Sequence, residues 1–399
     1  MKVIKAPRIL LPNHSINLQK WSVIACDQFT SEPEYWQQLS DFVGNSPSTL
    51  HMIFPEVYLG KNEDEIIKSI NQNMLQYFQK SYFVDEGECF VLIDRKTQFK
   101  EQRLGLVMSI DLDAYDYSEK SNSYIRATEK TVISRIPPRV KIRKDAIFEI
   151  PHVQLLMDDR DQHIIENLYL NRSKYQELYN FDLNMNGGHL KGYKITDTAL
   201  IISDLEKLIK DNLLFIVGDG NHSLATAKAC WEMIKTSLNT SEIQTHPSRY
   251  AMVELINIHD NGLEFEPIHR VLFDVKDDFL QGLIPLASGD SNCFVYRKNT
   301  GKIPFPLTNN APEAIRLVQD YIDQYITVHK DVVVDYVHGE DSLISICQKH
   351  PTAIGITLPP IDKSDIFEYV AHFGVLPRKS FSMGEASEKR YYLECRKIK

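Results

Sequence analysis

An apolar run that passes through two glycines into a helix constrains the fold of this chain more than any other segment. Residues 213–217 (LLFIV) have the composition of a buried strand, and Gly218-Asp219-Gly220 follows at once. Glycine tolerates positive φ, so it suits a sharp turn and lets a ligand approach the backbone. Residues 223–238 then have the composition of a helix. A strand, a tight turn and a helix in this order indicate an α/β fold.

The first residues of this helix are the best candidates for an anion-binding site. Asn221, His222 and Ser223 fall where backbone N–H groups and the helix dipole attract negative charge. Asp219 and His222 flank the helix start, as proton transfer or metal-assisted phosphate chemistry requires, so both are predicted to be catalytic. Gly220, Asn221 and Ser223 are predicted to bind phosphate. A Gly-Asp-Gly turn capped by Asn or Ser is the alternative interpretation, and this fragment alone does not separate the two.

The charge balance and the scattered cysteines exclude several classes of protein. With 399 residues, the chain has room for two or three domains, and its formal charge of −9 argues against binding nucleic acid. Its six cysteines lie singly, without a C-x-x-C pair, as expected in a reducing compartment. No stretch reaches the roughly 18 apolar residues of a membrane span. We therefore expect a cytoplasmic protein that contacts neither membrane nor nucleic acid. The sequence is compatible with either a monomer or a homodimer.

Local patterns predict elements on both sides of the Gly-Asp-Gly turn. Residues 124–150 alternate polar and apolar side chains, and Pro137-Pro138 is expected to break this run into two halves. The other expected elements are a hairpin over 88–111, a helix over 163–181, a second hairpin over 249–273 and alternating helices and strands over 311–373.

This order of elements predicts a mixed α/β protein with two regions. Residues 1–274 are expected to form a mixed α/β region that contains the helix-start site. Residues 275–399 are expected to form a C-terminal α/β domain that closes the site, because their strands and helices alternate.

Several segments resemble known families. GDGNHSLATAK (218–228) is similar to the Asp-Gly-x-His-Arg helix start of the ParB-like superfamily, which includes free serine kinases and nucleotide-binding chromosome-partitioning proteins. Four further segments resemble the domain-of-unknown-function 1015 family within that group. They are WSVIACDQFTSEPEYW (21–36), IRATEKT (125–131), GLEFEPIHRV (262–271) and GVLPRKSFSMGEASEKRYYLE (374–394). The resemblance implies a ParB-like mixed-sheet core with a C-terminal α/β unit.

The resemblance also implies a role for the helix start. It places Asp219, Gly220 and His222 at the corner that contacts phosphate in ParB-like kinases. Where many relatives have arginine after the histidine, this chain has Ser223, so a guanidinium must come from elsewhere or be absent.

Other family-like segments are expected to supply cations and a base. Arg126 and Arg270 are the candidates for supplying a guanidinium that donates hydrogen bonds to the phosphate. Glu129 is a candidate general base if a bulge turns it towards the site, although a surface carboxylate paired with Lys130 or Arg126 explains it equally well. His269 is assigned to the same site, with a structural hydrogen bond as its alternative.

The segment that follows Pro377 adds small hydroxyl side chains and further cations. Arg378, Lys379 and Ser380 are assigned to an anion pocket of backbone N–H groups, with capping of the domain as the alternative. Lys389 and Arg390 reinforce the cationic character of this segment.

These assignments predict phosphotransfer on a small hydroxylated metabolite, with serine or phosphoserine as the substrate that the resemblance suggests. Kinase and phosphatase directions are both open. The resemblance implies ATP or ADP as cofactor together with Mg²⁺, which Asp219 would ligate through water, and a small phosphorylated ligand as partner. The alternative is a non-catalytic nucleotide-binding regulatory module of ParB-like type.

Two other proposals are weaker. Cys26 follows an apolar run but has no histidine near it in sequence, so a buried thiol explains it better than a nucleophile. His152, Asp158 and Asp159 resemble a metal-ligand set, but an acidic pair after a strand usually starts a turn.

Overall fold

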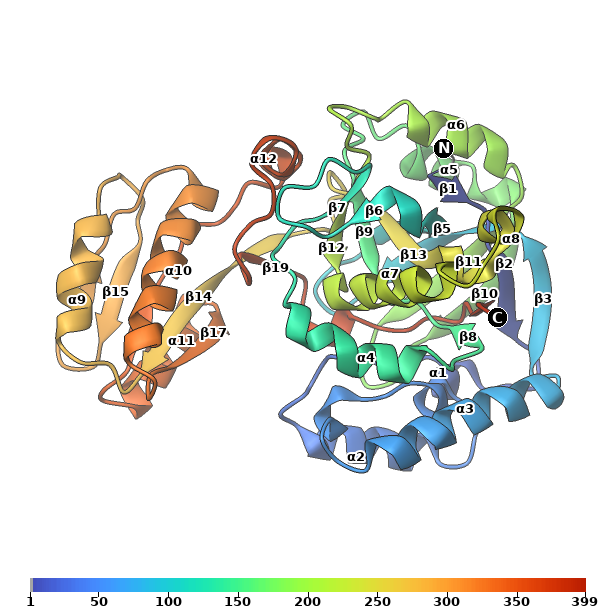
Figure 1. The fold of residues 1–399 in the computed structure, drawn as a ribbon, viewed down its shortest axis with the longest axis horizontal. Helices are drawn as coiled ribbons and strands as arrows, with labels where there is room; N and C mark the ends of the chain where they lie inside the picture. The colour runs from blue at the N-terminus through green and yellow to red at the C-terminus, as the bar shows by residue number, and fades with distance from the viewer. Residues whose placement is uncertain (1–2) are drawn as a thin grey trace. The chain divides into compact units, whose positions relative to one another are not determined.

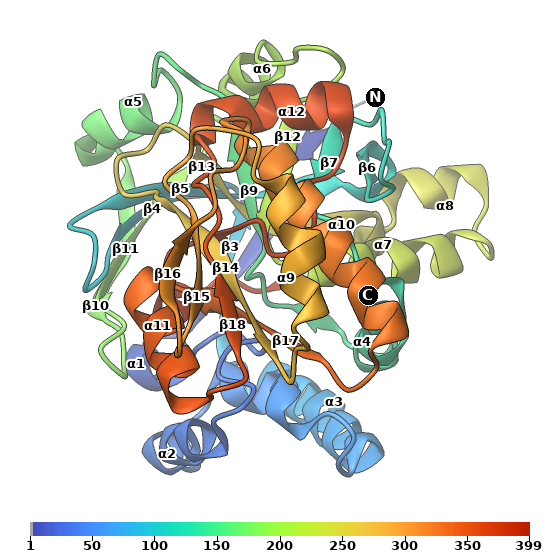
Figure 2. The ribbon, with the colours of Figure 1, turned by 90° about the vertical axis from the view of Figure 1, so that its left-hand side faces the viewer.

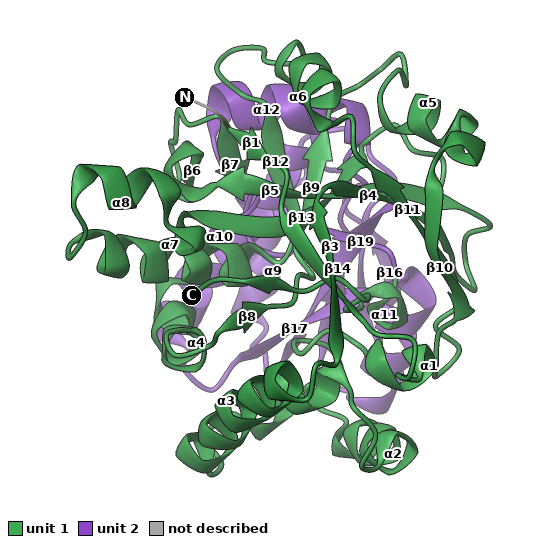
Figure 3. Ribbon diagram, turned by 90° about the vertical axis from the view of Figure 1, so that its right-hand side faces the viewer, with its two compact units in different colours: residues 1–127, 131–263, 385–399 green, residues 128–130, 264–384 purple. Residues whose placement is uncertain are grey.

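The computed structural model describes residues 3–399, which fall into two units (Figure 3). Unit 1 comprises residues 3–127, 131–263 and 385–399, and unit 2 comprises residues 128–130 and 264–384. The sequence predicts one boundary at 274/275, whereas the units change at 263/264 and the C-terminal segment returns to unit 1.

Unit 1 contains most of the strands and the Gly-Asp-Gly turn (Figure 1). Its helices are α1 (Leu18–Trp21), α2 (Pro33–Val43), α3 (Glu63–Gln79), α4 (Ile136–Arg143), α5 (Ile165–Leu170), α6 (Thr198–Glu206), α7 (Asn221–Lys235) and α8 (Thr240–Thr245). Its strands are β1 (Ile4–Lys5), β2 (Arg8–Pro12), β3 (Phe83–Glu88), β4 (Phe90–Lys96), β5 (Arg103–Asp111), β6 (Tyr115–Asp116), β7 (Ile125–Ala127), β8 (Phe148–Glu149), β9 (Gln154–Met157), β10 (Gln176–Asp182), β11 (His189–Ile195), β12 (Phe215–Asp219), β13 (Tyr250–Asn257) and β20 (Arg396–Lys397).

The main sheet of unit 1 mixes parallel and antiparallel pairs. Its order is β10-β11-β4-β5-β13-β9-β12-β7-β6, with β1 beside β5. The pairs β13–β9, β12–β7 and β6–β7 are parallel, and the other pairs are antiparallel. β12 therefore lies between β9 and β7, so the turn at its carboxyl end is flanked on both sides by backbone.

Separate apolar clusters bury the two faces of this sheet, because side chains alternate along a strand. Leu106 and Met108 of β5 belong to one cluster with residues of α5, α6 and α7, whereas Val107 belongs to another with residues of α3. α4 packs beside α7 (Figure 1). The start of α7 is thus held by a buried sheet and by a neighbouring helix.

Unit 2 has an antiparallel sheet between helices. Its strands are β14 (Phe265–Phe273), β15 (Phe294–Arg297), β16 (Gly301–Pro304), β17 (Val333–His338), β18 (Ile354–Ile356) and β19 (Phe381–Met383), in the order β16-β15-β18-β14-β17 with β19 beside β14. Its helices are α9 (Asp278–Leu283), α10 (Ala311–Val328), α11 (Glu340–Lys349) and α12 (Ile366–Phe373). α10 and α11 lie on opposite sides of the strands (Figure 2). The predicted mixed α/β class is confirmed, as is the hairpin over 88–111, which forms β4 and β5.

Three local predictions were wrong, each because a tertiary partner overrides a local pattern. Residues 163–181 contain only one short α-helix, α5, and their last residues belong to β10, which pairs with β11. β13 and β14 both form, but they belong to different sheets and make no hairpin. Pro137 and Pro138 do not separate two strand-like halves: they stand in the first turn of α4, where a missing N–H costs nothing.

No helix within residues 3–399 combines the length and the apolar composition that a membrane crossing requires.

Candidate functional site

The backbone at the start of α7 requires glycine. β12 ends at Asp219, Gly220 has a φ of 81°, and α7 begins at Asn221. This φ lies in the left-handed region that glycine adopts without strain. A Cβ on Gly220 would also lie 3.0 Å from both Cα and Cγ2 of Val153, just before β9. The glycine therefore serves both the turn and the close packing of the neighbouring chain.

An ion pair stands at this turn. Asp219 Oδ2 lies 2.9 Å from Lys389 Nζ, and its Oδ1 accepts the Gly220 N–H at 2.8 Å. Burial alone would raise the pKa of Asp219, but Lys389 and the Gly220 N–H outweigh it and leave the pKa lowered. Asp219 is therefore an ionised carboxylate at neutral pH.

Lys389 was missed as a member of this site, because it is 170 positions from Asp219 in the chain. The signal was its place in EKRYYLE, a family-like segment. This segment runs alongside residues 23–25: Ala25 donates its N–H to the Lys389 carbonyl, and Tyr391 donates its N–H to the Val23 carbonyl. The C-terminal segment thus brings a cation to the helix start.

The imidazole of His222 is tied to a neighbouring loop. Its Nε2 accepts the Val132 N–H at 3.2 Å, and its carbonyl accepts the Thr226 hydroxyl at 2.7 Å. A neutral imidazole whose Nε2 accepts carries its proton on Nδ1. His222 is therefore oriented by the Val132 amide.

The next two side chains of the helix start differ in their surroundings. Ser223 Oγ lies 3.0 Å from His152 Nε2, and the His152 ring meets Tyr391 edge-on with centroids 5.0 Å apart. Asn221 Oδ1 is buried and makes no hydrogen bond within residues 3–399. An unpaired buried acceptor is costly, so it fits a ligand that brings a donor.

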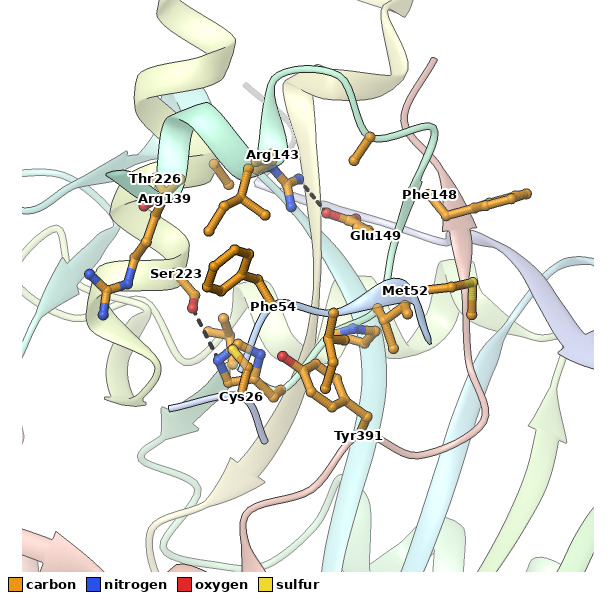
Figure 4. Close-up of a pocket in the computed structure, with 18 of the residues that line it drawn as sticks. Cys26, Met52, Phe54, Arg139, Arg143, Phe148, Glu149, Ser223, Thr226 and Tyr391 are labelled. Atoms are coloured by element: carbon orange, nitrogen blue, oxygen red, sulfur yellow. Dashed lines mark hydrogen bonds and ion pairs between the residues drawn. The ribbon is translucent and has the colours of Figure 1, made fainter. Parts of the chain in front are cut away.

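A cavity of about 160 Å³ adjoins this helix turn within unit 1 (Figure 4). Ser223 and Thr226 of α7, Cys26 and Tyr391 are among its lining residues and are labelled in Figure 4. Sequence reasoning set aside Cys26 because no histidine is near it in the chain, and His152 because the acidic pair weighed with it usually starts a turn. Burial raises the pKa of the Cys26 thiol, which is therefore not a thiolate nucleophile.

Arg126 lies away from the helix start. It is on β7, paired in register with Ile216 of β12. Its guanidinium donates to the carbonyls of Ser123, Asp211 and Asn212, and the last two precede β12. These contacts hold turns at the amino end of β12, whereas Gly220 follows its carboxyl end.

A second group of predicted residues comes together within unit 2. Glu129 accepts the N–H of Lys379 at 3.0 Å and of Ser380 at 2.9 Å. The turn that was expected to hold an external anion therefore holds a carboxylate of the chain itself. Burial raises the pKa of Glu129, and the backbone N–H donors offset part of this effect.

Two of the predicted cations of unit 2, Arg270 and Arg378, also have protein partners. Arg270 donates to Gln319 Oε1 at 2.8 Å and to the Ile268 carbonyl at 2.7 Å, and burial lowers its pKa to about 10. Arg378 pairs with Asp323 at 3.1 Å.

His269 has the structural role that was its alternative interpretation. Its Nδ1 accepts the Leu358 N–H at 3.2 Å, and burial lowers its pKa to about 4. The ring is therefore neutral at physiological pH.

Asp158 and Asp159, the acidic pair after β9, start a turn. They do not form a metal site with His152. Asp158 Oδ1 lies 2.6 Å from His259 Nε2, and Asp159 accepts the Ile164 N–H at 2.9 Å. No cluster of three or more His, Cys, Asp or Glu side chains suited to a metal ion occurs within residues 3–399.

Comparisons with known proteins complete this description. No curated protein matches the sequence. The likeness to solved structures is weak, as three of them illustrate. A conserved hypothetical protein from Pyrococcus furiosus is 9% identical, with 73% of this chain and 95% of that chain covered and a TM-score of 0.39. A mutant free serine kinase in complex with ADP is 9% identical, with coverage of 77% and 95% and a TM-score of 0.41. SbnI with a C-terminal truncation, from Staphylococcus aureus, is 11% identical, with coverage of 70% and 82% and a TM-score of 0.38.

Likeness at this level carries no argument about activity. The family evidence comes from the sequence, where the model described as "Protein of unknown function (DUF1015)" matches residues 10–334. This match spans most of the chain, which therefore belongs to the DUF1015 family.

Proposed function

We propose that the start of α7 binds the phosphoryl group in a transfer to or from a small hydroxylated metabolite. The observation that carries the proposal is the Asp219–Lys389 ion pair, 2.9 Å long, at the N-terminus of a long helix. The helix N-terminus favours anions through its N–H groups and its dipole. Its N-cap residue is Gly220, so no N-cap side chain competes for those N–H groups.

The polar groups at this point suit both halves of such a substrate. Lys389 offers the cation that phosphoryl oxygens need. It takes the role of the arginine that many relatives have at the position of Ser223. Asp219 is held ionised and is the candidate base for the substrate hydroxyl. The buried Asn221 Oδ1 is an acceptor for a hydroxyl donor. Serine and phosphoserine are the first substrates to test.

Within residues 3–399, the start of α7 offers no cage for a resident Mg²⁺. Both oxygens of Asp219 already have partners, and the residues 3–399 contain no cluster of metal ligands beside it. In this proposal ATP or ADP enters with Mg²⁺ on its own phosphates, as is common for nucleotides. All six cysteines are free thiols, which supports a reducing compartment such as the cytoplasm for this reaction.

Turnover with defined substrates tests the proposal. The protein is incubated with Mg²⁺, serine and either ATP or ADP, and in reverse with phosphoserine and AMP or ADP, and products are followed by ³¹P NMR. We expect phosphoserine to form or to be consumed. Lys389→Met should lower kcat/KM by about a hundredfold or more, because one charged contact to the transferred group is lost. Lys389→Arg should retain part of the activity.

Lys235→Met is the matched control. Lys235 also forms an ion pair, with its Nζ 2.7 Å from Asp113 Oδ1. It is the last residue of α7, so it stands at the opposite end of the helix from Asp219. Its replacement should leave kcat/KM within about twofold, since the helix dipole acts only within the terminal turn. Equal losses in both methionine variants would contradict the assignment of Lys389. Saturable binding of ADP without any turnover would favour the regulatory module over the enzyme.

A further inference from the structure

The cavity beside α7 is apolar over most of its wall. Its volume of about 160 Å³ is close to that of the engineered apolar cavities, about 150 Å³, that bind benzene. The apolar lining comes from η1 (Thr49–Met52), α3, α4, α7 and β13, including Met52, Ile70, Met74, Ile142, Leu224 and Met252. Most of the wall is apolar, so placing a hydrocarbon group against it removes apolar surface from water and is favourable.

One end of the cavity is lined by polar side chains, and two of them, Cys26 and Tyr391, are uncharged. Burial raises the pKa of both, so they remain SH and OH. Ser223 Oγ lies 3.0 Å from His152 Nε2, and both residues also line the cavity. Hydroxyl, thiol and imidazole groups at one end of an apolar space suit a ligand with one hydrogen-bonding group.

The ionised side chains on the cavity wall are paired with one another. Arg139 pairs with Glu56, and Arg143 Nη2 lies 2.6 Å from Glu149 Oε2 (Figure 4). Glu149 Oε1 also lies 2.6 Å from Arg396 Nη2, so Arg143, Glu149 and Arg396 together carry one net positive charge. Both carboxylates of the wall are thus paired, and neither is left to balance a cationic ligand. Burying a cation without a partner is costly, which excludes a positively charged group from the apolar part of this space.

We propose that this cavity binds a small uncharged alcohol or phenol with a single ring, whose ring fills the apolar part and whose hydroxyl faces Ser223 and His152. The proposal goes beyond phosphotransfer and does not depend on it, because it rests on the size and the lining of the cavity. Ser223 belongs to both the cavity and the start of α7. If both proposals hold, the hydroxyl-bearing substrate carries an apolar group.

Methionine methyl groups report directly on this cavity. Met52, Met74 and Met252 line it, whereas Met233 is 59% exposed and Met157 is buried in another cluster. The full chain, labelled with ¹³C at its methionine methyls, is titrated with benzyl alcohol. We expect saturable shifts at Met52, Met74 and Met252 and none at Met233 or Met157. Absent shifts at these three, or equal shifts at all methionines, would overturn the proposal.

A charged analogue and a filled cavity sharpen the test. Benzylamine has the same ring but is protonated at neutral pH, so it should produce no saturable shift; binding equal to that of benzyl alcohol would contradict an uncharged ligand. Ala146→Leu fills part of the cavity and should abolish the shifts, whereas Ala199→Leu on the exposed side of α6 should leave them unchanged. Ala227→Val is the milder filling variant if Ala146→Leu fails to fold, and unchanged binding in a folded filling variant would also overturn the proposal.

The outcome is separable from that of the phosphotransfer assay, because the titration uses no nucleotide and needs no turnover. Shifts without phosphotransfer would leave the cavity assignment standing while the proposed function fails. Phosphotransfer without shifts would do the reverse.

Discussion

Replacing Arg103 by methionine is expected to lower the free energy of unfolding by about 3–5 kcal/mol, because it leaves a buried carboxylate without its cation. Arg103 Nη2 lies 2.9 Å from each oxygen of Glu254 and donates to the Tyr392 hydroxyl at 2.7 Å. The side chains of Arg103 and Glu254 are only 9% and 8% exposed. Water therefore cannot replace the lost partner.

Urea unfolding followed by circular dichroism measures this loss, with Lys96→Met as the matched control. Lys96 also pairs with a glutamate, Glu101, but these side chains are 53% and 90% exposed. Exposed pairs contribute roughly 0–1 kcal/mol, so the control should change stability little. The double variant Arg103→Met with Glu254→Gln should recover part of the loss, since no unpaired charge remains. Similar losses in the two single lysine and arginine variants would contradict this account.

This buried cluster supports the candidate site through the C-terminal segment. Tyr392 and Glu394 belong to the cluster, while Lys389 and Tyr391 on the same segment reach Asp219 and the cavity. Neighbouring side chains of an extended segment point to opposite sides. The contacts among Arg103, Glu254 and Tyr392 therefore hold the backbone of the segment that carries Lys389.

Stability should fall by about 3 kcal/mol between about pH 4.5 and pH 7 through Glu394 alone. Burial raises the pKa of Glu394 from 4.5 to about 7, and hydrogen bonds such as that from the Tyr179 hydroxyl, at 2.5 Å, offset only part of this. In this pH range the folded chain holds a proton that the unfolded chain has released. Unfolding thus releases a proton, so the folded state loses stability as the pH rises through this window.

The measurement is the urea midpoint from pH 4.5 to pH 8 for the natural chain and for Glu394→Gln. Glutamine does not titrate, so the stability of the natural chain relative to the variant should fall with pH and level off above about pH 7. Glu101→Gln, at a carboxylate whose side chain is 90% exposed, is the control and should leave the pH profile unchanged. A constant difference between the natural chain and Glu394→Gln would show that this carboxyl does not carry the effect.

Local physics determined much of what the sequence predicted. The turn at Gly220 follows from an apolar strand, a residue that accepts positive φ and a helix-forming segment, all within about 25 positions. The helices and strands from α10 to α12 follow from their own periodicity in the same way. Each of these elements depends on neighbours in the chain, so the sequence alone was sufficient.

Tertiary pairing decided the elements whose local signals compete. Residues 176–182 became β10 because β11 offers a partner, although the preceding residues favour a helix. The two prolines of α4 were compatible with either a break or a helix start, and packing of α4 beside α7 accompanies the second outcome. A pattern shared by two structures is resolved only by the contacts that each structure makes.

Which distant side chains meet was also decided by the tertiary structure. The sequence determined that Asp219 to Ser223 would stand together at one helix start, because they are consecutive. It did not determine that Lys389 would join Asp219, that Arg126 would turn to the amino end of β12, or that Glu129 would accept the amides of residues 379–380. Those contacts depend on the order of strands in the sheet and on the return of the C-terminal segment to unit 1, which only long-range burial and pairing establish.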